Sequence, residues 1–240
     1  MMKTFFWFLY FIWTLFATLP SLKKVKKLDR ENKIEERNKI TQQTAMAWAA
    51  SLVRKSGSSI KVYGQENVPK DSNVLIVSNH QSNFDIPVLI SSIDKLVGFI
   101  AKKELGKIPI MNSWMMYLRC VLINRGNPRD ALKAINQGAE YLKEGYSQVI
   151  FPEGTRSASG IVGEFKPGSL KLAKKSGVTI LPVAIKGAHK IMEKGSLAIH
   201  PAEVEVHILP PIYKEEYIDQ KDTSELAARL QRMIAEKVNG

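Results

Sequence analysis

Residues Val74 to Asp85 read VLIVSNHQSNFD, a short apolar run that passes directly into a polar segment. The apolar part has the length and composition of a buried β-strand. Ile86 and Pro87 follow at once, and a proline in the first turn is typical of the start of a helix. A strand that leads through a polar turn into a helix is the repeating unit of layered α/β folds, so this stretch indicates the fold class.

The same alternation continues on both sides of this unit. Further strands are predicted at residues 60–63, 97–101, 121–123, 148–151, 179–185 and 204–209, and helices at residues 128–142, 168–175 and 223–238. Such an order favours an α/β fold with a mostly parallel sheet flanked by helices, in which the chemistry lies beyond the strand ends. The 240 residues suffice for one catalytic domain, residues 56–240, preceded by an N-terminal helical segment, residues 1–55.

The N-terminal segment is predicted to contact a membrane. Phe5 to Leu19 carries no charge, and as a helix it would span about 22 Å, against roughly 30 Å of hydrocarbon in a bilayer. It therefore either crosses the membrane or lies in one leaflet. A cleaved signal peptide is the alternative, but no small-residue cleavage site follows. Four lysines between residues 23 and 27 come next, which favours an anionic surface on the cytoplasmic face of the cell membrane.

Charge supports this prediction. In residues 1–55, Lys and Arg outnumber Asp and Glu by seven, out of a net charge of +12 for the whole chain. No zinc-finger or RNA-recognition spacing is present, so the basic excess does not indicate a nucleic-acid partner. Residues 22–40 are predicted to form a solvated helix. Residues 41–55 carry one apolar stripe, and this helix either contacts the membrane or is buried on the catalytic domain.

His80 and Asp85 form the first candidate site, directly after the strand at residues 74–78. On one continuous helix, five residues would separate the two side chains by about 140°. A turn between them can instead bring the carboxylate onto one imidazole nitrogen, leaving the other free to accept a proton from a hydroxyl group. The alternative is that His80 merely ends the strand and Asp85 caps the helix.

Phe151 to Ser157, with the sequence FPEGTRS, forms the second candidate site, and it also follows a predicted strand. It combines a glycine, two hydroxyl groups and a guanidinium group, which are the groups that bind a phosphate monoester. The alternative is an ordinary polar loop in which Arg156 pairs with Glu153.

The two sites in this order resemble the glycerolipid acyltransferase family of 1-acylglycerol-3-phosphate acyltransferases, whose signatures are N-H-x4-D and F-P-E-G-T-R-S. Three further blocks carry the resemblance: KKEL at residues 102–105 before Ile108 and Pro109, VLINR at residues 121–125, and LPVAI at residues 181–185. It covers roughly residues 60–210. Asn112, Ser113 and Arg119 depart from residues that are common in relatives, which bears on the details of substrate preference.

The resemblance implies a role for each matching residue. His80 would be the general base, and Asp85 would orient it. The residues implied in acceptor binding are Arg125, Glu153, Gly154, Thr155, Arg156 and Ser157, with Lys103 as a further candidate for a phosphate contact. Residues 181–185 would form a buried strand with Pro182 fixing its edge.

The implied reaction transfers an acyl group from a thioester donor to the free sn-2 hydroxyl of lysophosphatidate, giving phosphatidate. Acyl-CoA or acyl carrier protein would be the co-substrate, and no cofactor is expected. No metal is expected either, because His189, His200 and His207 lack acidic or thiol partners at ligand spacing. A covalent acyl-enzyme is not expected, since there is no G-x-S-x-G motif and Cys120 is the single cysteine. The alternatives are another lysophospholipid or glycerol 3-phosphate as acceptor, a non-catalytic lipid-binding membrane protein, or an esterase.

Overall fold

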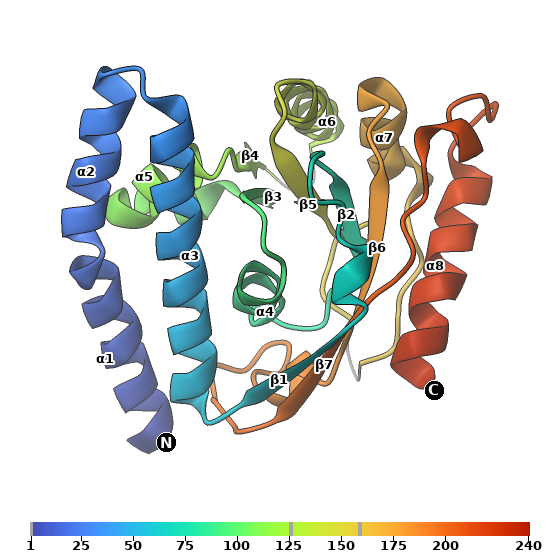
Figure 1. The fold of residues 1–240 in the computed structure, drawn as a ribbon. Helices are drawn as coiled ribbons and strands as arrows, with labels where there is room; N and C mark the ends of the chain where they lie inside the picture. Colours follow the sequence, from blue (N-terminus) through green and yellow to red (C-terminus); the bar gives the residue numbers. More distant parts are fainter. Residues whose placement is uncertain (1, 125–126, 158–159) are drawn as a thin grey trace.

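The computed structural model describes residues 2–124, 127–157 and 160–240 (Figure 1). Its strands are β1 (Ser59–Tyr63), β2 (Leu75–Ser78), β3 (Val97–Lys102), β4 (Val121–Ile123), β5 (Ser147–Ile150), β6 (Ile180–Lys186) and β7 (Glu203–Ile208). Its helices are α1 (Met2–Ala17), α2 (Leu19–Arg30), α3 (Ile34–Ser56), α4 (Asp85–Ser92), α5 (Pro109–Tyr117), α6 (Pro128–Lys143), α7 (Lys171–Ser176) and α8 (Ser224–Asn239).

The seven strands form one sheet in the order β1-β7-β6-β2-β5-β3-β4. Only β6 and β7 pair in antiparallel orientation, so the expected mostly parallel α/β sheet is confirmed. Each predicted strand is present within one residue of its expected ends. Helices α3 and α4 cover one face, and α6, α7 and α8 cover the other (Figure 1).

At the level of single elements, two predictions need correction and one helix was missed. The helix expected at residues 168–175 is a short 3-10 turn, Pro167–Leu170, followed by α7. Helix α5 was not predicted. The segment at residues 22–40 is not one solvated helix: Asn32 adopts a left-handed conformation with φ of 56°, and it separates α2 from α3. These two helices run antiparallel, side by side (Figure 1).

Helices α2 and α3 bury side chains where they pack together, although both helices contain many charged residues. Leu22, Val25 and Leu28 are buried at helical spacing, and Arg37 and Thr41 of α3 are buried as well. Near the C-terminal end of α3, Leu52 packs into the core on the face of the sheet that α4 covers. The helix at residues 41–55 is therefore buried on the catalytic domain, which was one of the two alternatives.

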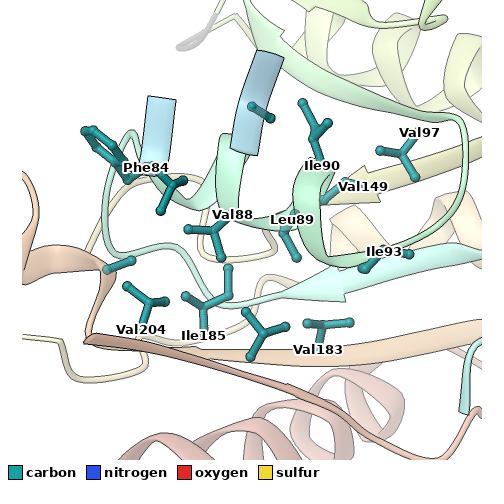
Figure 2. Packing of buried hydrophobic residues seen from close by; sticks show 14 of the residues in the cluster. Phe84, Val88, Leu89, Ile90, Ile93, Val97, Val149, Val183, Ile185 and Val204 are labelled. Carbon is teal, nitrogen blue, oxygen red and sulfur yellow. The ribbon is translucent and has the colours of Figure 1, made fainter. Parts of the chain in front are cut away.

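Helix α4 is held on the sheet by its apolar face. Val88 and Leu89 are fully buried, and Figure 2 shows them pointing toward Val183 and Ile185 of β6. Burying side chains of this size typically contributes about 1.5–3 kcal/mol each. Because Asp85 is the first residue of α4, this packing fixes its position relative to the end of β2.

Pro182 lies in β6 as part of a buried strand, as expected, but this strand is in the interior of the sheet and Pro182 does not mark an edge. Ile180 and Val183 are three residues apart in β6. Their partners in the following segment, Ile212 and Ile208, are four residues apart. The extra residue forms a β-bulge opposite Pro182. Proline has no backbone N–H, and at the bulge this absence leaves no hydrogen bond between the strands unmade.

Candidate active site

His80 and Asp85 meet across a tight turn. His80 Nδ1 lies 2.7 Å from Asp85 Oδ2, and the Asp85 side chain is fully buried. The same oxygen accepts hydrogen bonds from the backbone N–H groups of Gln81, at 2.6 Å, and Ser82, at 2.8 Å. Because these two backbone donors stabilise a carboxylate, Nδ1 carries the proton of the neutral imidazole and donates it to Asp85. His80 Nε2 is then left as a proton acceptor.

Neighbouring residues fix the His80 ring in place. The ring stacks on Phe151, with 4.2 Å between the ring centroids and 14° between the planes. The two residues follow β2 and β5, which pair in parallel, so their carboxyl ends reach the same edge of the sheet. Asn79, the residue before His80, exchanges two hydrogen bonds of 2.8 Å with the backbone of Ile185. Asn79 is the first residue of the N-H-x4-D signature, but the sequence predicted no role for it.

The FPEGTRS segment holds the backbone of His80 on both sides. Glu153 Oε1 accepts a hydrogen bond from the His80 backbone N–H at 2.7 Å, and the Ser157 N–H donates to the His80 carbonyl at 2.8 Å. Glu153 Oε2 accepts from the Gly163 N–H at 3.1 Å. Both carboxylate oxygens of Glu153 are therefore engaged by backbone donors, so the alternative of a Glu153–Arg156 pair does not describe this loop.

Burial raises the pKa of the Glu153 carboxyl, and the hydrogen bonds from His80 and Gly163 oppose that shift. Glu153 is 5% exposed, and both of its carboxylate oxygens accept hydrogen bonds from backbone N–H groups. Glu153 thus couples the two motifs mechanically, which differs from the acceptor contact that the family resemblance implies for it.

A cavity of about 460 Å³ opens beside His80. Its apolar wall comes from β3, β4, β5 and α6, and its polar side comes from the FPEGTRS segment and the turn before α7. The lining residues are His80, Ile100, Ile123, Ala131, Leu132, Ala134, Ile135, Ile150, Phe151, Pro152, Gly154, Lys166, Gly168, Ser169 and Lys171. The His80 imidazole, an apolar wall and the ammonium groups of Lys166 and Lys171 therefore share one space.

Of the remaining predicted residues that the structure describes, Gly154 is in the cavity wall. It has a φ of 70°, a left-handed conformation that favours glycine. Among the described residues, the side chains of Thr155, Arg156 and Ser157 are not part of the lining, and neither is Lys103, which lies in the 3-10 turn Lys103–Lys107. Arg125 lies outside the residues that the structure describes.

A second cavity, of about 130 Å³, lies between α3, α4, α5 and β3 and is almost entirely apolar. Cys120 is in its wall, and burial raises the pKa of this thiol to about 12. Such a thiol stays protonated near neutral pH and is a poor nucleophile. Within residues 2–124, 127–157 and 160–240, no group of three or more His, Cys, Asp or Glu side chains is placed to hold a metal ion.

With this geometry in view, similarity to known proteins identifies the family. The model of the acyltransferase family matches residues 59–186, more than half of the 240 residues, and this region contains both motifs. The chain belongs to the acyltransferase family. The match spans the strands from β1 to β6, so it covers every element that positions His80 and its cavity.

Individual relatives agree with this assignment. A 1-acyl-sn-glycerophosphate acyltransferase from Thermotoga maritima, known from its crystal structure, is 32% identical in sequence. The two structures superpose with a TM-score of 0.86 over 99% of the present chain and 94% of the Thermotoga chain. A chloroplastic 1-acyl-sn-glycerol-3-phosphate acyltransferase of Arabidopsis thaliana is 40% identical over 64% of the chain. That match covers 44% of the plant protein.

A 1-acyl-sn-glycerol-3-phosphate acyltransferase of Borreliella burgdorferi is 35% identical over 65% of the chain and 63% of its own length. The matching region thus spans between 44% and 63% of these two curated relatives. The solved Thermotoga structure, in contrast, is matched along nearly its whole length, N-terminal helices included.

Proposed function

We propose that this acyltransferase transfers an acyl group from a thioester donor to the free sn-2 hydroxyl of lysophosphatidate, giving phosphatidate. The observation that carries the proposal is the 2.7 Å contact between His80 Nδ1 and Asp85 Oδ2 at the wall of the cavity that Gly154 also lines. The relatives named 1-acyl-sn-glycerol-3-phosphate acyltransferases support the same acceptor.

In the proposed reaction, His80 is the general base and Asp85 orients it. Nε2 of His80 takes the proton from the acceptor hydroxyl as the hydroxyl oxygen attacks the thioester carbonyl. The new C–O bond forms, the C–S bond breaks, and the thiolate that leaves receives the proton from His80. General-base catalysis of this kind typically contributes 10²- to 10⁴-fold, and the stacked Phe151 ring keeps the imidazole in the orientation that this requires.

Transfer is proposed to be direct, without a covalent acyl-enzyme. Cys120, the single cysteine, faces the other cavity and has a pKa of about 12, so it supplies no thiolate nucleophile. The donor is acyl-CoA or acyl carrier protein, acting as co-substrate. The apolar wall of the His80 cavity would accept hydrocarbon from either substrate.

A membrane is the proposed source of the acceptor. Residues 2–30 form one helical stretch that is long and apolar enough to cross a membrane. Six large side chains share its outer face and are all exposed: Phe5, Phe6, Leu9, Ile12, Trp13 and Phe16. On the inner face, the Trp7 indole N–H donates to the Leu52 carbonyl of α3 at 3.0 Å.

One face of α1 is therefore occupied by the protein, which favours an anchor lying in one leaflet over a crossing. The lysines between residues 23 and 27 would bind the anionic surface on the cytoplasmic face of the cell membrane.

Substitution of the proposed base tests the function directly. His80→Ala should reduce acyl transfer at least a hundredfold while lysophosphatidate binding is retained, because the imidazole acts on the transition state. His200→Ala is the matched control, since His200 is exposed. Acyl transfer is measured in parallel with lysophosphatidate, another lysophospholipid and glycerol 3-phosphate. Full transfer by His80→Ala would overturn the catalytic assignment, and lipid binding without transfer by the wild-type chain would favour a non-catalytic role.

A further inference from the structure

Lys166 lies across the open side of Gly154. A β-carbon built on Gly154 would lie 3.2 Å from Lys166 Nζ, 3.7 Å from its Cε and 3.8 Å from its Cδ. The last part of the lysine side chain therefore runs directly over the glycine. Both residues line the cavity that contains His80, so the ammonium group faces the space where the reaction would occur.

The backbone of Lys166 is fixed to the same loop. Its N–H donates to the Pro152 carbonyl at 3.1 Å, and its carbonyl accepts the Ser169 N–H at 3.1 Å. The preceding residue, Phe165, is 2% exposed and anchors the segment in the core on the α8 side of the sheet. A side chain that starts from a fixed point loses less conformational entropy when its end group binds a ligand.

The charge of Lys166 is available for a ligand. None of the ion pairs among the described residues includes Lys166. The Glu153 carboxylate does not engage Lys166, because its oxygens accept the His80 and Gly163 N–H groups. An ammonium group in this setting suits a phosphate oxygen, to which it forms a charge-assisted hydrogen bond.

We propose that Lys166 binds a substrate phosphate in the His80 cavity, over Gly154. The inference rests on the acyl-transfer function proposed above. Both substrates carry such a group, the acceptor as a phosphate monoester and the donor in coenzyme A or in the phosphopantetheine arm of acyl carrier protein. Glycine at position 154 leaves room for the ammonium, since a β-carbon there would lie 3.2 Å from Lys166 Nζ, and it accommodates the left-handed backbone, which would strain any other residue.

The test compares three full-length variants with wild type. Lys166→Gln removes the charge, Lys166→Arg keeps it, and Lys175→Gln removes the charge of an exposed lysine on α7 that is not in the cavity wall. The KM for lysophosphatidate and the KM for acyl-CoA are measured separately in mixed micelles. The Kd for lysophosphatidate and the Kd for coenzyme A are measured by calorimetry. Unfolding temperatures within a few degrees of wild type are expected, because Lys166 is exposed.

Loss of one hydrogen bond to a charged group should raise the KM and Kd of the phosphate-bearing substrate about tenfold to a hundredfold in Lys166→Gln. Lys166→Arg should retain most of the affinity, and Lys175→Gln should match wild type. A rise confined to lysophosphatidate identifies the acceptor phosphate, and a rise confined to acyl-CoA identifies the donor. Values within twofold of wild type for both substrates overturn the proposal. Wild-type protein without acyl transfer overturns the proposed function instead, and the two Kd values still test Lys166.

Discussion

Replacing Glu153 by glutamine tests whether Glu153 positions His80 or binds the acceptor. The two carboxylate oxygens accept the N–H groups of His80, at 2.7 Å, and Gly163, at 3.1 Å. A glutamine retains one accepting oxygen and presents an NH₂ group to the other donor. One charge-assisted hydrogen bond is lost and one backbone N–H is left buried without a partner, which is typically worth about 1.5–3 kcal/mol.

Relief of the buried charge offsets part of that loss, since burial raises the pKa of Glu153 and so disfavours its ionised form. We therefore expect Glu153→Gln to lower the free energy of unfolding by about 1–3 kcal/mol, or the unfolding temperature by roughly 2–12 °C. Because the His80 backbone shifts with the lost bond, kcat should fall about tenfold to a hundredfold, with the KM for lysophosphatidate nearly unchanged.

The assays are thermal unfolding and steady-state kinetics on the same preparations. Glu164→Gln is the matched control, because Glu164 is an exposed carboxylate in the same loop. A raised KM for lysophosphatidate, together with an unaltered kcat and unfolding temperature, would refute the positioning role and return Glu153 to the acceptor contact that the motif implies.

Two further outcomes follow from the N-terminal helix and the single cysteine. The double substitution Phe5→Ser and Trp13→Ser should lower partitioning onto anionic vesicles at least a hundredfold. Each aromatic side chain would contribute about 1.5–3 kcal/mol when it leaves water and enters the membrane. Their exposures of 60% and 64% predict an unchanged unfolding temperature, and vesicle co-sedimentation equal to wild type would contradict the anchor. Because burial raises its pKa to about 12, Cys120 should resist iodoacetamide at pH 8 in the native protein, where nearly all of the thiol is protonated. Mass spectrometry should detect alkylation only after unfolding in guanidinium, and comparable native labelling would contradict the raised pKa.

Local patterns predicted the elements of this acyltransferase well where each element depends mainly on its own residues. The strand at residues 74–78 is apolar up to Ser78 and β-branched in part, and it lies within the buried sheet as expected. Helix α6 begins at Pro128 and ends at Lys143, as its amphipathic pattern indicates. Helix α5 was missed because its nine residues, PIMNSWMMY, are too few to establish a helical period, and the burial of Trp114 depends on contacts with other helices.

Long-range packing explains the errors. The lysines and glutamates of residues 22–40 suggest a solvated segment, whereas Leu22 and Val25 are buried because α3 and α5 pack beside α2. Arg37 is buried among Asp29, Asn38 and Tyr146, a partner 109 positions away in the sequence. Because the two residues in this contact lie far apart in the sequence, local charge wrongly predicted that the segment is exposed to solvent.

The sequence by itself determined the chemistry of this protein: an imidazole and a carboxylate five residues apart after a strand, a glycine-centred polar loop after another, and an apolar helix in front. Only the tertiary structure decided what each group contacts. Glu153 faces the His80 backbone, and Lys166, twelve residues beyond Gly154, covers that glycine at the cavity wall. The physical reason is that residue types and spacing set which bonds a group can form, whereas the parallel pairing of β2 with β5 sets which groups meet.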